Sequence, residues 1–546
     1  MSSHRRALAA QSLALALAAA GRERWRALLA AHGPGRLVAI ALVAVTLASP
    51  WPPLTIAALV AYAAVAFKRP GLTVALIPLC APFAYVPKRF YGPEFPVVEL
   101  LLLLALATAA VQVAVLGWRQ WRAGAGAAAV LDAWDAVRAA VTRPFGVQAV
   151  ALALIATFSL ATVADPAFRH ESLREYRTII LEPLAYFFLA RYWLRDRGLR
   201  GVAIAGFLAG AAAVALIAVG QYVTGAHLVV AEGARRVTSV YGHPNNLALY
   251  LERALPFALA LLVLRGAMSD ERSTKYEVRS TSDARRAMRG GRRGRRGRRR
   301  RAGVAPALTP RLTGADGWLI AAGAAVAVGI VLSFSRGAWV GVAVALAGLA
   351  LLAGRRAARV VILGALVVGA LLLPFTAGAR LQALLHGGGS VGLRELIWRS
   401  TLAMIRDHPA FGVGLDQFYY QYAPRYVLPA AWGERFTSHP HDLFLDFWVR
   451  LGIMGLAWVC WLLLAAGWRL TAAWRRAGAG ERPLLAAAGL ALVAAFVHGT
   501  IDNFYFLIDL AFIWWFLLAI ADIAIAATDT TDGGCTDGAS APREGW

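Results

Sequence analysis

Cysteine is nearly absent from this chain, with 3 among 546 residues. Cys80 and Cys460 lie inside apolar runs and Cys535 lies in a polar tail, so the thiols supply neither a disulfide framework nor a metal cluster. We expect no signal peptide either, because arginine interrupts residues 1–36 too often. We expect that stretch to be an amphipathic or disordered segment on the cytoplasmic side.

The alternation of apolar and polar residues that marks a membrane β-barrel is also missing. Instead, 59% of the residues are hydrophobic. Several apolar runs continue for about 17 to 25 residues without a charge, which is enough for a helix to cross the hydrocarbon layer. The sequence therefore predicts an all-α fold, a polytopic helical integral membrane protein.

The apolar runs predict about 12 to 14 transmembrane helices, and the first two runs are short and separated by proline. The runs lie at 37–49, 54–67, 71–86, 97–117, 147–164, 178–194, 200–222, 246–265, 316–334, 337–353, 359–376, 444–467, 483–500 and 504–526.

Positive charge is concentrated in particular loops, and this sets the expected orientation. The net charge of +25 would suggest a nucleic-acid partner in a soluble protein, but here it indicates topology, because arginine marks cytoplasmic loops. The segment 265–315 contains RRAMRGGRRGRRGRRRRAG, which is typical of a cationic linker held against anionic headgroups. A nucleic-acid arm is the alternative, and we expect no nucleic-acid partner. Only Lys88 and Arg89 oppose an orientation with the N-terminus inside.

These features divide the chain into seven expected regions. A loop as long as 377–443 is expected to form a partly helical extracytoplasmic domain. The regions are the cytoplasmic segment 1–36, the first bundle 37–265, the Arg-rich linker 266–315, the central helices 316–376, the loop 377–443, the last helices 444–526 and a disordered tail 527–546.

Two outward-facing arginines suggest an anion site. Arg336 stands in SFSRGAWVG, a very short outward turn between apolar helices. The positive-inside rule would place an arginine in a cytoplasmic loop, so it does not account for Arg336. Snorkelling is one explanation. The other is phosphate binding, because a guanidinium matches phosphate oxygens with a planar fork of donors. Arg236, in EGARRVTSVYGHPNNLALYL with Arg235 and His243, would supply a second fork. Two such groups suit a diphosphate.

The stretch FTSHPHDLFLDFWVRLG, residues 436–452, brings two histidines to the start of an apolar helix. His439 and His441 are either interfacial capping residues or, for His441, a general base. A helix N-terminus disfavours imidazolium and would keep His441 neutral. A metal held by His439, His441 and Asp442 is a third possibility, but the spacing lacks the i, i+4 register of helical zinc motifs. We expect no metal.

Other outward polar residues form a secondary set, which either lines a polar cleft or makes structural salt bridges. These are Arg174, Arg177, Asp416, Tyr419 and Asp502.

At these residues the chain resembles the O-antigen ligase family, within the group of ligases and polymerases that share a Wzy-type C-terminal domain. The resemblance covers about 180–525 and is carried by VYGHPNNLALYL, FSRGAWVG, FGVGLDQF and HDLFLDFWVRLGIMGL. It differs from the family pattern at Asp442, where asparagine is usual, and at Arg450, where glutamate is common.

The resemblance implies metal-independent, inverting glycosyl transfer without a cofactor, at the outer leaflet of the inner membrane. The donor would be a glycan on undecaprenyl diphosphate and the acceptor a hydroxyl of a glycan or lipid. Carried over by position, Arg236 and Arg336 would bind the diphosphate and His441 would activate the acceptor. The sequence does not display the glycan or the acceptor.

Two other functions compete with ligation. A polymerase that joins lipid-linked repeat units would use the same chemistry and nearly the same residues. A transporter is favoured by Glu182 and Glu252, which lie in or near apolar runs. The remaining polar groups gather at one outward face, and this favours chemistry at the membrane surface over transport.

Overall fold

The computed structural model describes residues 33–265 except 125, 232 and 233, then 314–364 except 356, 357, 360 and 361, and finally 390–532. The predicted segment 1–36 therefore lies almost wholly outside the described residues. So do most of the Arg-rich linker 266–315, the run 359–376 except for a few residues, the first part of the loop 377–443 and the end of the tail 527–546.

Seven helices of the described part are long and apolar enough to cross a membrane. These are α5 (Val97–Arg122), α10 (Arg197–Thr224), the helix Pro244–Arg265, α12 (Gly314–Ser333), α18 (Leu443–Arg476), α19 (Arg482–Gly499) and α20 (Ile508–Asp532). The prediction of a polytopic helical membrane protein is confirmed.

Further helices are short or bent. A bent pair, which α6 (Gly126–Thr142) and α7 (Gly146–Ala161) form across an 88° break, would make an eighth span. The shorter apolar helices are α2 (Pro34–Ala48), α3 (Pro52–Lys68), α4 (Pro70–Cys80, continued by a 3₁₀ turn Ala81–Phe83) and α13 (Arg336–Leu352). Several of these helices begin at proline, which suits the first helical turn because its missing N–H would have no partner there. The expected total of 12 to 14 spans stays a prediction.

The remaining elements are short. The run predicted at 178–194 becomes a π-helical segment, Tyr176–Leu181, followed by α9 (Glu182–Trp193). Two small antiparallel hairpins are formed by β1 (Lys88–Arg89) with β2 (Glu94–Phe95), and by β3 (Val229–Ala231) with β4 (Ala234–Arg236). The other segments are Pro166–Phe168, α8 (Arg169–Glu175), α16 (Ser390–Asp407), α17 (Phe418–Gln421), Tyr422–Tyr426 and Pro429–Glu434.

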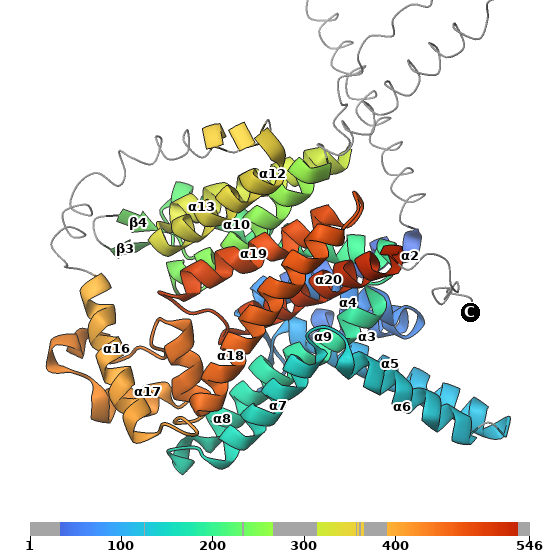
Figure 1. The fold of residues 1–546 in the computed structure, drawn as a ribbon, viewed down its shortest axis with the longest axis horizontal. Helices are drawn as coiled ribbons and strands as arrows, with labels where there is room; N and C mark the ends of the chain where they lie inside the picture. The colour runs from blue at the N-terminus through green and yellow to red at the C-terminus, as the bar shows by residue number, and fades with distance from the viewer. Residues whose placement is uncertain are drawn as a thin grey trace, which may run out of the picture.

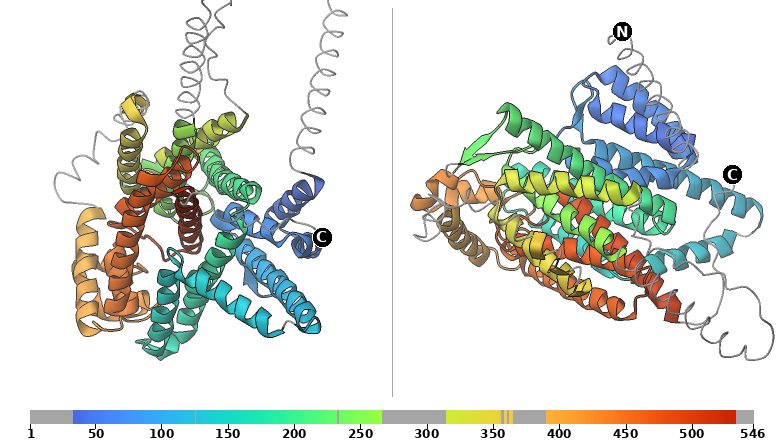
Figure 2. Two further views of the ribbon diagram at one scale, coloured as in Figure 1. Left: turned by 45° about the vertical axis from the view of Figure 1, so that its right-hand side comes forward. Right: turned by 90° about the horizontal axis from the view of Figure 1, so that it is seen from above.

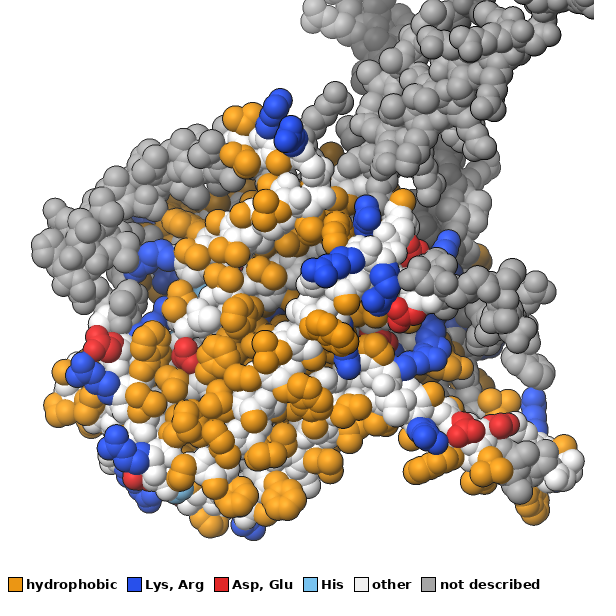
Figure 3. Space-filling view, in the orientation of Figure 1, with side chains coloured by type: hydrophobic (Ala, Val, Ile, Leu, Met, Phe, Trp, Pro, Cys, Tyr) orange, Lys and Arg blue, Asp and Glu red, His pale blue; other side chains and the backbone are white. Residues whose placement is uncertain are grey.

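Two helices form the centre of the bundle. In α20 and in Pro244–Arg265, 89% and 83% of the apolar stretch is buried, against 22% in α5. Helices α10, α12, α13, α18 and α19 surround this centre, whereas α5 and α6 project away from it (Figures 1 and 2). Apolar side chains cover the middle of the visible face, and most charged side chains lie towards its edges (Figure 3). This is the distribution expected of a surface that faces lipid.

One end of the bundle carries the non-spanning elements, and we call it the site end. Here α18 begins, α19 ends, and α16, α17, β3 and β4 gather (Figure 1). α16 packs against α18 and against the segments Tyr422–Tyr426 and Pro429–Glu434. The described part of the predicted outer loop is therefore partly helical, as expected.

Helix α18 is broken at Gly452, whose backbone has φ 69° and ψ −166°. The loop before it satisfies the freed backbone groups, because Val413 N–H donates to the Val449 carbonyl at 2.7 Å and Ile453 N–H donates to the Pro409 carbonyl at 3.1 Å. The break separates a short first segment, which follows the two histidines, from the long apolar remainder of α18.

We predict that Gly452→Ala destabilises the protein by at least about 1–2 kcal/mol, the usual cost of a left-handed backbone for a residue with a Cβ. The added Cβ would also overlap the backbone of Ala410 and Phe411. Thermal unfolding of the purified protein in detergent measures the effect. Gly467→Ala, also in α18, is the matched control because its Cβ would meet nothing within 4 Å. Equal unfolding temperatures for the two variants would contradict the role of this break.

Candidate active site

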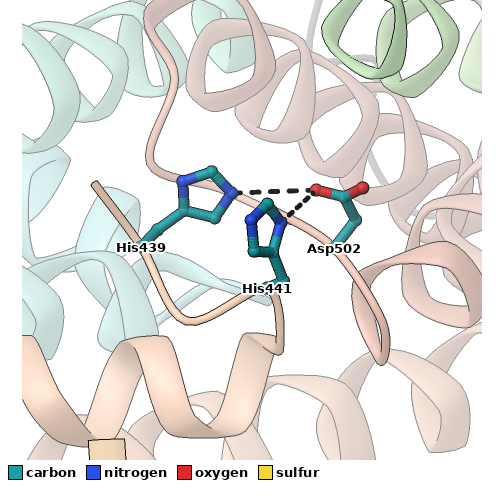
Figure 4. A group of neighbouring side chains, drawn as sticks. All are labelled: His439, His441 and Asp502. Atoms are coloured by element: carbon teal, nitrogen blue, oxygen red, sulfur yellow. Dashed lines mark hydrogen bonds and ion pairs between the residues drawn. The ribbon is translucent and has the colours of Figure 1, made fainter. Parts of the chain in front are cut away.

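Asp502 is the centre of a polar cluster at the site end. It lies in the turn between α19 and α20, and only 2% of its side chain is exposed. Its Oδ1 is 3.1 Å from His441 Nδ1 and accepts the Asn503 N–H at 2.8 Å. His439 Nε2 lies 3.7 Å from the same oxygen, beyond hydrogen-bond length. Figure 4 shows both imidazoles directed at this carboxylate from one loop. The cluster thus joins the start of α18 to the end of α19.

The second carboxylate oxygen binds two side chains from other parts of the chain. Asn245 Nδ2, near the start of the helix Pro244–Arg265, donates to Asp502 Oδ2 at 2.7 Å. Arg394 Nη2, near the start of α16, donates to the same oxygen at 2.8 Å. Four separate segments therefore meet at Asp502.

Asn245 also connects the cluster to Arg236. Arg236 Nη2 donates to Asn245 Oδ1 at 2.6 Å, and its Nε donates to the Ser333 carbonyl at the end of α12 at 2.8 Å. The neighbouring His243 accepts the Asn245 N–H at its Nδ1, 3.2 Å away. Arg236, Asn245, Asp502 and His441 thus form one continuous chain of polar contacts.

Arg336 is the first residue of α13 and is half-buried. The next residue, Gly337, packs so closely against His498 that a Cβ there would overlap the imidazole. His498 Nε2 lies 3.8 Å from Asp502 Oδ2, and its Nδ1 is 2.7 Å from Glu252 Oε2. The first turn of α13 therefore lies beside the residues that surround Asp502.

Electrostatics keep Asp502 charged. Burial by itself would raise the pKa of this carboxyl, but His439, His441 and the Arg394 guanidinium hold it well below its usual range. Burial, reinforced by the neighbouring His441, lowers the pKa of His439. The cluster at neutral pH therefore combines an ionised carboxylate with a neutral His439.

The loop that carries the histidines is strained and is held from two sides. His441 has φ 55°, a left-handed conformation that costs a residue with a Cβ about 1–2 kcal/mol. Asp442 caps α18 by accepting the Leu445 N–H at 2.8 Å, so it is directed at the helix and not at the histidines. Strain of this kind persists where surrounding contacts fix the backbone, and it clusters at functional sites.

Arg450 supports the other side of this loop. It is 3% exposed and pairs with Glu175 at 2.8 Å and with Asp446 at 2.6 Å. Its Nη2 donates to the Ser438 carbonyl at 3.0 Å, immediately before His439. Arg450, which stands where the family pattern has glutamate, thus has local partners of opposite charge.

The remaining predicted residues lie apart from Asp502. Arg174, 64% exposed, pairs with Glu171 at 2.9 Å and with Asp416 at 3.1 Å. The Asp416 N–H donates to the Glu175 carboxylate, which connects this group to Arg450. Arg235 is exposed in β4.

Two other members of the secondary set have local partners. Arg177 pairs with Glu99 and Glu182. The ring of Tyr419 packs edge-on against that of Tyr420. Among the described residues, neither side chain is bonded to Asp502.

His439, His441 and Asp502 are the described residues that come nearest to a metal site, with one ligand atom from each within 4.8 Å of the others. The Arg394 guanidinium already occupies the same carboxylate, and a bound cation would have to lie beside that positive charge. The arrangement suits a histidine–carboxylate pair better than a metal.

The sequence analysis missed Arg394, His498 and Thr437. His498 precedes Asp502 by one helical turn, a spacing that could have linked them. Thr437 Oγ1 lies 3.3 Å from His441 Nε2, and Arg394 contacts a residue 108 positions away. No local pattern signals a contact of that range.

The fold and the cluster define a multi-pass helical membrane protein with a histidine–carboxylate pair and several arginines at one end of its bundle. Residues 321–460 match the family model described as O-antigen ligase, so the resemblance seen in the sequence is confirmed over that range. Members of this family are ligases or polymerases. The matched range contains Arg336, Arg394 and His441, whereas Arg236 and Asp502 lie outside it. No curated protein matched the chain.

We predict that Arg450→Met destabilises the protein by about 3–5 kcal/mol, because it leaves the buried Glu175 and Asp446 without their cation. Thermal unfolding in detergent measures this loss. Arg476→Met is the control, because its pair with Asp529 is exposed and surface pairs contribute at most about 1 kcal/mol. An Arg450→Met protein as stable as the control would show that the ion pairs do not hold this loop.

Proposed function

We propose that this protein is a membrane glycosyltransferase of the O-antigen ligase type. In this proposal it transfers a glycan from undecaprenyl diphosphate to an acceptor hydroxyl, without a metal. The family match supports ligase or polymerase chemistry in general. The observation that carries the finer proposal is the 3.1 Å contact between His441 and Asp502, in a cluster that Asn245 links to Arg236.

We further propose that the site end faces the periplasm or exterior of the inner membrane. Basic residues flank the membrane helices at the opposite end, where α10 and α19 begin and α18 and α13 end, and basic residues in short loops beside membrane helices favour the cytoplasmic side. These residues are Arg197, Arg200, Arg355, Arg475, Arg476 and Arg482. Their position supports the orientation expected from the sequence.

In the proposed mechanism the diphosphate lies against Arg236 and Arg336. Their guanidinium groups stabilise the charge that develops as the bond between the anomeric carbon and the phosphate oxygen breaks. That oxygen keeps the bonding electron pair and leaves as undecaprenyl diphosphate. Because a diphosphate is a good leaving group, the site needs charge stabilisation there more than an acid.

The acceptor is activated from the other side. His441 donates a hydrogen bond from its Nδ1–H to Asp502, and this tautomer leaves Nε2, which lies 3.3 Å from Thr437 Oγ1, unprotonated and able to accept a proton. As the acceptor oxygen attacks the anomeric carbon, its proton passes to Nε2, and the imidazolium that forms is stabilised by the Asp502 carboxylate. One displacement of this kind inverts the anomeric configuration.

A polymerase that joins two lipid-linked glycans would use the same steps. The family match supports both activities equally. The acceptor alone distinguishes them, and we propose ligation as the first activity to test.

We predict that His441→Ala lowers the transfer rate by about 10² to 10⁴-fold, the usual contribution of a general base. The assay incubates purified protein with undecaprenyl-diphosphate glycan and candidate acceptors in EDTA, and identifies the product by mass spectrometry. His170→Ala is the control, since that histidine is 73% exposed on α8.

Full activity of a folded His441→Ala protein would refute the assigned base. Loss of wild-type activity in EDTA, restored by zinc, would instead favour a metal on His439, His441 and Asp502.

A further inference from the structure

Arg394 is a cation of this cluster that the proposed mechanism does not use. It stands in the first turns of α16, in the same region of the chain that supplies His441. Its guanidinium binds the Asp502 oxygen opposite the one that faces His441, at 2.8 Å. The side chain is 18% exposed, so it is neither sealed in the core nor free on the surface.

Asp502 has other donors besides Arg394. It accepts hydrogen bonds from Asn245 and from the Asn503 N–H, and His441 faces its Oδ1. A guanidinium, in contrast, carries five N–H donors in a planar fork. Among the described residues Asp502 is the one side chain that Arg394 bonds. Arg394 therefore has more donor capacity than its contact with Asp502 requires.

Arginine residues gather around Asp502. Arg236 reaches Asp502 through Asn245, Arg394 contacts it directly, and Arg336 begins α13 beside it. The neighbouring carboxylates Glu252 and Asp446 have partners of their own, because Glu252 pairs with His498 and Asp446 pairs with Arg450. Arg394 thus lies on the same carboxylate-centred chain of contacts as Arg236, which the proposed function places against the diphosphate, and a guanidinium there has the donor geometry that phosphate oxygens accept.

We propose that Arg394 is a third diphosphate-binding residue, an inference that rests on the proposed function. One edge of its guanidinium stays on Asp502, and the remaining N–H groups bind a phosphate oxygen of the donor. Because Asp502 also orients His441, Arg394 bridges the leaving group and the base. It thereby fixes the distance across which the acceptor hydroxyl must attack.

The test measures binding of undecaprenyl diphosphate without glycan to the full-length protein in detergent, by thermophoresis, with undecaprenyl monophosphate as comparison. We expect Arg394→Ala to weaken binding of the diphosphate by about 10- to 100-fold, as for loss of a hydrogen bond to a charged group. Arg394→Lys, which keeps the charge and loses the fork, should recover part of the affinity.

The matched control is Arg399→Ala on the same helix. Arg399 is 65% exposed and pairs with Glu395 at 2.6 Å, so its loss should leave binding unchanged. An equal loss for both variants would show a general effect of positive charge and would overturn the role of Arg394.

A purely structural role predicts a different result. If Arg394 only neutralised Asp502, then Arg394→Ala would have no effect in an Asp502→Asn background, where that charge is gone. We expect the same fold-loss of binding in both backgrounds. The double variant also contains no unpaired carboxylate, so it guards against misfolding of the single variant.

The outcomes separate this inference from the proposed function. Wild-type protein that binds undecaprenyl diphosphate, together with Arg394→Ala protein that binds it equally well, overturns the inference alone. Wild-type protein that does not bind undecaprenyl diphosphate overturns the proposed function and the inference with it.

Discussion

A buried carboxylate costs several kcal/mol unless charges and hydrogen bonds compensate it, and Asp502 is such a group. Its partners come from the start of α18, the start of the helix Pro244–Arg265 and the start of α16. Each partner must be in place for the charge to be tolerated. The requirement to satisfy this one carboxylate therefore holds together helix ends that are far apart in the sequence, and the polar cluster depends on it.

A second constraint acts on the loop that presents the histidines. Arg450 holds the Ser438 carbonyl, Asp442 caps α18, and between them His441 adopts a left-handed backbone. The break at Gly452 contributes as well, because it frees backbone groups of α18 that form hydrogen bonds with the loop 409–413. Contacts of the neighbouring residues thus hold the strained backbone of His441 in place, which is the usual setting of strained functional residues.

The sequence predicts the parts that follow from local chemistry. Apolar runs give the membrane helices because a chain in lipid must satisfy its backbone internally. The turn around Arg336 and the histidine pair stand out because charged or titratable residues are unusual at the start of an apolar helix. Their convergence was expected from the family resemblance, and the structure brings Arg236 and His441 into one chain of contacts.

Other features were beyond prediction because they depend on long-range packing. Asn245 and Asp502 are 257 residues apart, and nothing near either one indicates the other. Asp442 adjoins the histidines in the sequence, but its side chain caps the helix that follows it. The break at Gly452 lies inside the run predicted at 444–467, and the close approach of Ala410 and Phe411 that accompanies it depends on a distant part of the chain.

The central claim is that Asp502 orients His441 as a base, and the transfer rate of Asp502→Asn tests it most directly. Asparagine keeps the size of the side chain but can offer an N–H where a carboxylate oxygen was, which favours the wrong histidine tautomer. We predict a rate about 10² to 10⁴-fold lower with the protein still folded. A folded Asp502→Asn protein that transfers glycan at the wild-type rate would contradict the account.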